Sequence, residues 1–188
     1  KISGPGIITF GSPHAEDTTI DADTDGEYVI RLTVVDNAGN SNCDELTLTW
    51  DTTPPEVDAG TDKLTNTQVL QDGTASDLAG IASYEWSKIS GPGIITFGSS
   101  HTEDTTIEAD TDGEYVLRLT VVDNAGNSNY DDMTLTWDTT PPEVSAGDDV
   151  LTNAQVLQDG TASDINGIAS YEWSKISGPG IITFGNPH

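Results

Sequence analysis

Apolar and polar residues alternate along most of the chain, which is the pattern of β-strands with one buried face. The longest example is residues 114–123, where one face of the predicted strand carries Tyr115, Leu117, Leu119 and Val121. Residues 82–86 and 133–137 alternate in the same way. No stretch shows the 3.6-residue period of an amphipathic helix. The chain is therefore predicted to be all-β.

A repeat of 87 residues organises these strands. Residues 1–53 match residues 88–140 at 46 of 53 positions, and residues 54–101 match residues 141–188 at 40 of 48. A period of this length is typical of a whole small domain in tandem rather than of one turn of a solenoid.

The boundary between repeats is predicted at the segment DTTPPEV, which begins at Asp51 and again at Asp138. Its two prolines fix φ and stiffen the chain. The predicted parts are 1–53, the C-terminal part of one repeat; 54–140, a complete repeat; and 141–188, the N-terminal part of the next. Two explanations of the partial repeats remain open. Either the sequence is a window of a longer array, or the tail of one copy completes the head of another, head to tail.

About seven short strands with turn signals in 87 residues indicate an antiparallel β-sandwich. Two residues favour the immunoglobulin-like type: Trp86 lies in the third strand, and Tyr115 lies where such folds carry a tyrosine corner. Leu117 stands at the position of the second cysteine of antibody domains, and the chain has one cysteine, Cys43. The predicted fold is thus a tandem of immunoglobulin-like sandwiches without disulfides.

The net charge of the chain limits the kinds of molecule that it is expected to bind. The chain has 32 acidic and 6 basic residues, for a net charge of −26. Such a surface repels phosphate, so we expect no binding to nucleic acid. No apolar run is long enough for a membrane helix, so membrane insertion is not expected either. Because this acidity exceeds what solubility needs and the ligand types are hard oxygens, calcium is the predicted cofactor.

The topology of a seven-strand sandwich predicts where calcium would bind. Each junction between repeats brings three parts together. They are the turn before the last hairpin of one repeat, the linker formed by DTTPPEV, and two loops of the next repeat. The predicted ligands at the first junction are Asp21, Asp23, Asp25, Asp51, Glu56 and Asp77, in the company of Asp123, Asn124 and Asn127. At the second junction they are Asp110, Asp112, Asp138, Glu143 and Asp164.

A plainer interpretation stays open beside this one, namely solvated acidic loops of a salt-adapted protein. The segment DADTDG resembles the start of an EF-hand loop, but position twelve is Leu32 instead of glutamate, and no helices flank it. The segment DNAGN is read primarily as a hairpin turn.

No catalytic residues are predicted. His14, His101 and His188 are copies of one loop position without a nucleophile at a recognisable spacing, so a catalytic triad is not expected. Trp50 and Trp137 are interpreted as capping the end of the core, with stacking on sugars as the other use of such residues.

The segments LQDGTASD, GIASYEWSKISGPG and DGEYVLRLTVVDNAGN resemble the polycystic-kidney-disease (PKD) type and related receptor-for-egg-jelly type modules of bacterial and archaeal surface proteins. The resemblance covers almost the whole repeat. It departs from many PKD modules at Trp86-Ser87-Lys88, where those carry Trp-x-Phe-Gly-Asp-Gly. It implies an extracellular or cell-surface spacer in a prokaryote, often with calcium and without catalysis.

The leading hypothesis is accordingly a non-enzymatic extracellular stalk or filament of head-to-tail repeats, stiffened by calcium at the junctions. Its partners would be neighbouring copies of itself. The alternative is an adhesin or a carbohydrate-binding accessory module of a secreted protein, with a glycan or surface ligand as partner.

Overall fold

The computed structural model describes residues 1–185, and every regular element in that range is a β-strand. His188 lies outside the described residues. The chain divides into two compact units, residues 1–137 and the residues from 138 onward. The prediction of an all-β chain is confirmed.

Residues 1–53 of the first unit contain two hairpin-like pairs. The strands are β1 (Ile8–Phe10), β2 (Ile20–Ala22), β3 (Gly26–Val35) and β4 (Ser41–Trp50). β1 pairs antiparallel with β2, and β3 pairs antiparallel with β4. The β3–β4 hairpin turns at residues 36–40, where the side chain of Asp36 accepts hydrogen bonds from the backbone N–H groups of Ala38 and Asn40.

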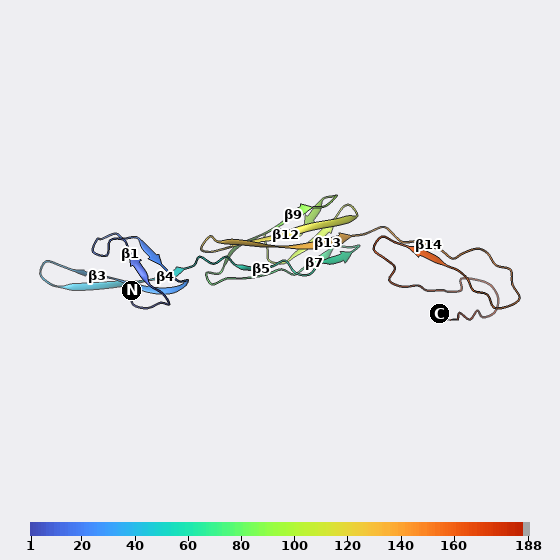
Figure 1. Cartoon of the computed structure of the whole chain (residues 1–188), viewed down its shortest axis with the longest axis horizontal. Coiled ribbons are helices and arrows are strands. Elements are labelled where there is room, and N and C mark those ends of the chain that lie inside the picture. The colour runs from blue at the N-terminus through green and yellow to red at the C-terminus, as the bar shows by residue number, and fades with distance from the viewer. Residues whose placement is uncertain (186–188) are drawn as a thin grey trace. The chain divides into compact units, whose positions relative to one another are not determined.

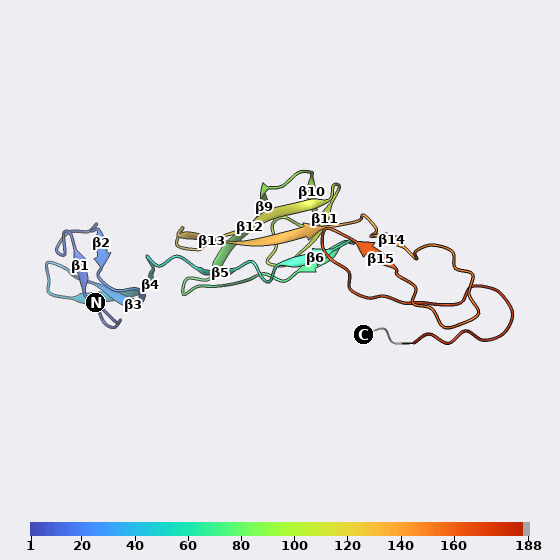
Figure 2. The ribbon, with the colours of Figure 1, turned by 45° about the vertical axis from the view of Figure 1, so that its right-hand side comes forward.

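Residues 54–137 form a sandwich of nine strands (Figures 1 and 2). They are β5 (Glu56–Asp58), β6 (Lys63–Thr65), β7 (Val69–Gln71), β8 (Thr74–Ser76), β9 (Ile81–Ser90), β10 (Ile95–Phe97), β11 (Thr105–Ala109), β12 (Gly113–Asp123) and β13 (Ser128–Trp137). One sheet has the order β6-β13-β12-β9 and a second has the order β10-β11-β7. β5 pairs with β8. β6 runs parallel to β13, and the other pairs are antiparallel.

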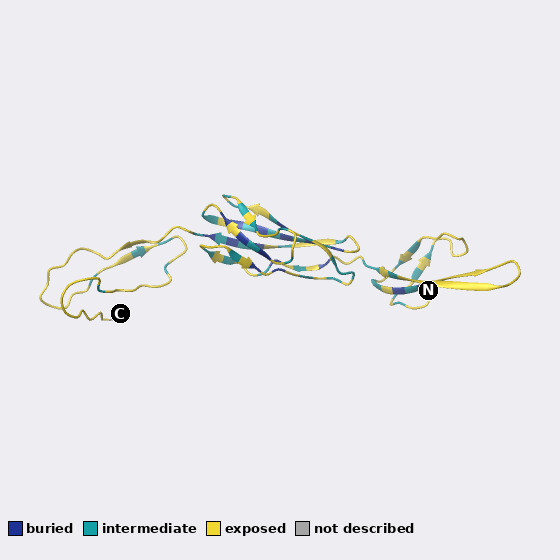
Figure 3. Cartoon of the chain, turned by 180° about the vertical axis from the view of Figure 1, so that it is seen from behind, coloured by how far each residue is buried: buried dark blue, intermediate teal, exposed yellow. Residues whose placement is uncertain are grey.

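The core of this sandwich lies between the two sheets. The alternation predicted for residues 114–123 is confirmed, because Tyr115, Leu117, Leu119 and Val121 are all fully buried. Ile107 and Ala109 meet them from the second sheet. Figure 3 shows the buried residues concentrated in this part of the chain, whereas much of the β3–β4 hairpin is exposed.

Two aromatic residues, at the positions that the sequence predicts, stabilise the sandwich by hydrogen bonds. The hydroxyl of Tyr115 donates a hydrogen bond of 2.6 Å to the carbonyl of Thr111 and accepts one from the N–H of Gly93. This is the tyrosine corner. The indole N–H of Trp86 donates to the carbonyls of Thr102 and Glu103, so the one polar atom of this buried ring is satisfied. The fold is an immunoglobulin-like β-sandwich.

The strand predicted at residues 82–86 differs in one respect. Ala82 is exposed, whereas Ile81 packs against the core. A register shift lies here, because Val122 is opposite Ser83 and Asp123 is opposite Ile81. A β-bulge inserts one extra residue and moves the following side chain to the other face. Strict alternation therefore fails at Ala82 but holds at Tyr84 and Trp86.

The second unit carries two described strands, β14 (Glu143–Ser145) and β15 (Thr161–Ser163), which pair antiparallel. Much of the remainder of residues 138–185 has no regular structure, and many of its apolar side chains are exposed. In the described part of the chain, no helix is long and apolar enough to span a lipid bilayer.

Candidate metal centre

Three aspartates from separate segments of the first unit converge beside the linker. Asp51 follows β4, Asp77 follows β8, and Asp123 is the last residue of β12. One carboxylate oxygen from each lies within 4.8 Å of the others. Asp123 is buried, and Asp51 and Asp77 are half-buried. This group is called the aspartate cluster below.

Local turn chemistry explains why each aspartate holds its position. The Oδ1 atom of Asp77 accepts a 2.7 Å hydrogen bond from the N–H of Ala79, and that of Asp51 accepts one of 3.2 Å from Thr53. These are Asx turns, in which an aspartate side chain caps the backbone that follows it.

Asp123 does the same for the hairpin loop between β12 and β13. Its Oδ1 atom accepts the N–H groups of Ala125, Gly126 and Asn127 at 2.7–2.9 Å, and its Oδ2 atom accepts the side-chain amide of Asn127. In each aspartate of the cluster, the Oδ1 atom accepts a hydrogen bond from at least one backbone N–H group. The second oxygen of Asp51, Oδ2, is buried and has no hydrogen-bond partner.

The electrostatics of the cluster differ from one aspartate to the next. Burial raises the pKa of Asp51, and the neighbouring carboxylates of Asp77 and Asp123 raise it further. Burial also acts to raise the pKa of Asp123, but the hydrogen bonds from Asn127, Gly126 and Ala125 outweigh it and hold that pKa below its ordinary value. The charge of Asp51 is therefore less compensated than that of Asp123.

The linker, residues 51–55, is held by hydrogen bonds from the segment before it and from the sandwich after it. From residues 1–53, the carboxylate of Asp25 accepts hydrogen bonds from the N–H and hydroxyl of Thr52 and from the hydroxyl of Thr53. From the sandwich, Asn127 donates to the carbonyl of Asp51, and Asn129 donates to the carbonyl of Pro55.

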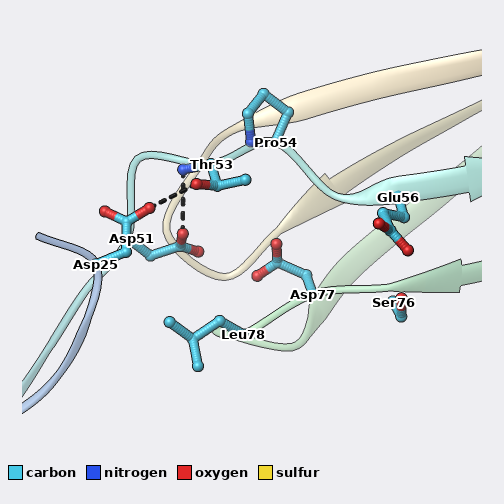
Figure 4. Close-up of a pocket in the computed structure, with 8 residues that line it drawn as sticks. All are labelled: Asp25, Asp51, Thr53, Pro54, Glu56, Ser76, Asp77 and Leu78. Atoms are coloured by element: carbon cyan, nitrogen blue, oxygen red, sulfur yellow. Dashed lines mark hydrogen bonds between the residues drawn. The ribbon is translucent and has the colours of Figure 1, made fainter.

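Figure 4 shows the pocket that this arrangement forms. Its lining residues are Asp25, Asp51, Thr53, Pro54, Glu56, Ser76, Asp77 and Leu78. Four of the ligands predicted for the first junction, Asp25, Asp51, Glu56 and Asp77, thus line one pocket. Asp123, interpreted from sequence mainly as a turn residue, joins Asp51 and Asp77 in the cluster.

Two other predicted ligands serve the fold locally. Asp23 accepts a hydrogen bond of 2.6 Å from the N–H of Ile7, and its counterpart Asp110 accepts one of 2.7 Å from the N–H of Ile94. Asp21 lies in the middle of β2, opposite Thr9, and is exposed. Asp112 lies in the turn before β12.

The remaining predicted ligands lie in the second unit. Glu143 begins β14 and is exposed. Asp138 accepts a hydrogen bond from Thr140 through Oδ1 and one of 2.7 Å from the side-chain amide of Asn166 through Oδ2. Asp164 accepts the N–H of Asn166. The residue that corresponds to Asn166 in the complete repeat is Ala79. Asp138 therefore has an amide donor at the atom that is left unpartnered in Asp51.

Two family profiles match the chain. Residues 59–136 match the profile described as "K319L-like, PKD domain", and residues 4–52 match the one described as "Bacterial Ig-like domain". The solution structure of the PKD domain from KIAA 1837 protein aligns with a TM-score of 0.40 and 25% identity, covering 50% of this chain and 96% of that one.

Two mammalian proteins are among the curated relatives of the chain. The Dyslexia-associated protein KIAA0319 homolog of Rattus norvegicus is 31% identical over 165 residues, which is 80% of this chain and 15% of that protein. The Dyslexia-associated protein KIAA0319-like protein of Mus musculus is 29% identical over 170 residues, 82% of this chain and 16% of that protein. The chain therefore spans about a sixth of the length of these relatives. The prokaryotic source expected from sequence stays a prediction. The chain is thus similar to a PKD domain over residues 59–136 and to a bacterial immunoglobulin-like domain over residues 4–52.

Proposed function

We propose that this chain is a non-enzymatic structural module of an extracellular protein, in which immunoglobulin-like repeats follow one another as a stalk or filament. The similarity to PKD and Ig-like domains supports this function. The near-identity of the repeats supports it too, since copies that differ at few positions serve the same task. β12 has 11 residues, so at about 3.3 Å per residue each repeat adds several nanometres of length.

The observation that carries the proposal is the fixed linker. Asp25 holds Thr52 and Thr53 from one side, and Asn127 and Asn129 hold backbone carbonyls from the other. Pro55 is fully buried, and its ring fixes φ. A linker bonded in this way loses the freedom of a flexible tether, which is what a load-bearing or spacing array requires.

Calcium is the proposed cofactor of the aspartate cluster. Three carboxylates within 4.8 Å repel one another, and a divalent cation would offset that repulsion. Carboxylate oxygens are the ligands that calcium prefers, and the buried Oδ2 atom of Asp51 is free to coordinate. Bound there, the ion would join the linker to two loops of the sandwich. The second predicted set, around Asp138, stays a prediction.

Calcium is expected to bind the full chain with a Kd of about 0.1–1 mM, the range of extracellular calcium modules. Asp51→Asn is expected to weaken binding at least about tenfold, because it removes one of three charges. Affinity should fall as the pH is lowered through the raised pKa of Asp51, since protons then compete with calcium. Titration calorimetry measures the binding.

In the absence of calcium, the same raised pKa predicts that the free energy of unfolding decreases as the pH rises from the ordinary aspartate pKa through the raised one.

Two variants provide the controls. Glu108→Gln removes the same charge from an exposed position of β11 and should leave calcium affinity unchanged. Asn166 donates its side-chain amide to Oδ2 of Asp138, and Ala79→Asn places the same amide beside Asp51. This variant should weaken calcium binding, because the amide would occupy Oδ2 of Asp51.

Small-angle scattering should show a stiffer chain in calcium than in chelator for the wild type but not for Asp51→Asn. Equal affinity in the wild type and Asp51→Asn, or a response matched by sodium at equal ionic strength, would favour solvated acidic loops instead.

The alternative of a carbohydrate-binding module receives little support from the sandwich. Trp86 and Tyr115 are buried and Tyr84 is half-buried, so these rings do not form an exposed platform. Trp137 is also buried, which supports its interpretation as a cap of the core.

A further inference from the structure

The loops that follow β8 and β15 have the same backbone turn but differ in one polar side chain. Residues 77–80 read DLAG, and residues 164–167 read DING. In each loop, Oδ1 of the aspartate accepts the N–H of the third residue, at 2.7 Å and 2.8 Å, and the glycine N–H donates to the aspartate carbonyl. The third residue is Ala79 in one loop and Asn166 in the other, so the side chain varies on a constant backbone.

The linkers that precede these loops are also alike. Both read DTTPP, and Oδ1 of the first aspartate accepts the N–H of the second threonine, at 3.2 Å for Asp51 and 3.1 Å for Asp138. The strands that follow, β5 with β8 and β14 with β15, pair in the same register. All of these contacts lie within residues 51–80 and 138–167, so two complete segments are being compared.

The second oxygen of the linker aspartate has a partner in one segment and none in the other. The side-chain amide of Asn166 donates a hydrogen bond of 2.7 Å to Oδ2 of Asp138. Ala79 offers no donor, and Oδ2 of Asp51 is buried without a hydrogen-bond partner. A carboxylate oxygen that leaves water needs a hydrogen-bond donor or a positive charge to offset its lost hydration. Asn166 supplies that donor for Asp138.

We propose that the third residue of this loop decides how the linker aspartate is held. Asparagine at position 166 ties Asp138 to the loop through its own amide, whereas alanine at position 79 leaves Oδ2 of Asp51 to a divalent cation. The second statement rests on the proposed calcium site, and the first does not. The residue at this position thus selects between a linker that needs calcium and one that does not.

The orientation of the asparagine amide follows from the charge of its partner. Toward a carboxylate without a metal ion, only the NH2 group of asparagine makes a favourable contact, since the amide oxygen would be repelled. An N–H at Oδ2 occupies the oxygen through which the linker aspartate would reach a cation. The resulting bond joins the linker to the loop after β15, just as calcium would join Asp51 to Asp77 after β8.

The inference separates two junctions that the sequence alone treats alike. The sequence predicts calcium at both linkers, but Asn166 gives Asp138 a partner that calcium would have to displace. An array that contains both kinds of linker keeps some of them fixed when calcium is withdrawn and stiffens at the others when calcium returns. Its stiffness is therefore graded by calcium rather than switched on and off.

The melting temperature of the sandwich, measured by calorimetry of the full chain in chelator, tests the amide bond. Ala79→Asn places the amide beside Asp51, and Ala79→Leu is the matched control, with a side chain of similar size and no donor. The Ala79→Asn variant should melt about 4–8 °C above the Ala79→Leu variant, as expected for one added hydrogen bond in a small domain. With Asp51→Ala also present, the two should melt alike, since the acceptor is gone.

Two results of this comparison would overturn the proposal. One is an Ala79→Asn variant that melts no higher than the Ala79→Leu variant. The other is a difference between them that persists when Asp51 is replaced by alanine, because the asparagine would then act through some other contact.

The same variants in calcium separate this inference from the proposed function. Calcium should raise the melting temperature of the wild type more than that of Ala79→Asn, in which Oδ2 of Asp51 is already occupied. An equal or larger rise in Ala79→Asn overturns the proposal, since the amide oxygen would then serve as a further calcium ligand. No rise in the wild type refutes the proposed calcium site and the cation half of this inference, while the result in chelator decides the amide bond by itself.

Nuclear magnetic resonance of the full chain examines Asn166 directly. Its side-chain NH2 resonances should shift on Asp138→Ala and should be the same in calcium and in chelator. Resonances that do not respond to the loss of Asp138, or that move when calcium is added, would overturn the statement that the amide holds this linker without a metal ion.

Discussion

Leu119→Asp is expected to unfold the sandwich of residues 54–137, whereas Leu32→Asp is expected to leave that sandwich folded. Leu119 is fully buried in the core, so the variant loses about 3 kcal/mol of apolar packing and places an unpaired carboxylate in an apolar site. A domain of this size has about 4–13 kcal/mol of stability in total. The two losses together are of that order, so the folded state is no longer the stable one.

Leu32 provides the matched control because it occupies the same position in a nearly identical strand but is more than half exposed. Circular dichroism and amide hydrogen exchange of the full chain measure the effect. Protection of the amides in β12 and β13 should disappear in Leu119→Asp and persist in Leu32→Asp. Equal protection in the two variants would show that Leu119 does not belong to a packed core.

Asp123→Ala is expected to lower the melting temperature of the sandwich by about 10 °C. The Oδ1 atom of Asp123 accepts three backbone N–H groups of one hairpin loop, and its removal leaves these donors without a partner. The matched control is Asp36→Ala. Asp36 makes the corresponding bonds to Ala38 and Asn40, but it is exposed, so water replaces the lost acceptor and the effect should be slight.

Asp123→Asn separates the structural role from the metal role. The amide oxygen still accepts the N–H groups, so most of the melting temperature should be retained, while calcium affinity falls with the lost charge. Acid should mimic Asp123→Ala. The pKa of Asp123 is lowered, so its stabilising contribution is present above the ordinary aspartate pKa and is lost as the pH falls through the lowered value. If Asp36→Ala and Asp123→Ala lower the melting temperature equally, the burial of Asp123 does not make its hydrogen bonds to the β12–β13 loop more stabilising than those of Asp36.

The core of the sandwich could be predicted from the sequence because its strands are long and one-sided. Alternation identifies the buried face of residues 114–123, and Trp86 and Tyr115 occupy the two positions that mark an immunoglobulin-like fold. The bulge at Ala82 could not be predicted, since nothing in the residues 81–86 distinguishes a regular strand from one with an inserted residue.

The site could be predicted only in part. Topology brings Asp51 and Asp77 to one end, and the structure places them together. Sequence does not distinguish Asp23, which binds the N–H of Ile7, from Asp25, which holds the linker, because both belong to one acidic turn. Asp123 has a sufficient explanation as a turn residue, so its second role depends on where the loop lies in space.

The most direct test of the account is the unfolding of residues 54–140 expressed alone. If one repeat is a self-sufficient sandwich, this fragment should have the circular dichroism of β-structure. It should melt in a single cooperative transition with equal calorimetric and van't Hoff enthalpies, and Trp86 should be shielded from solvent until that transition. A disordered or helical spectrum, or a gradual loss of signal without a transition, would contradict the claim that the 87-residue repeat is the structural unit of this protein.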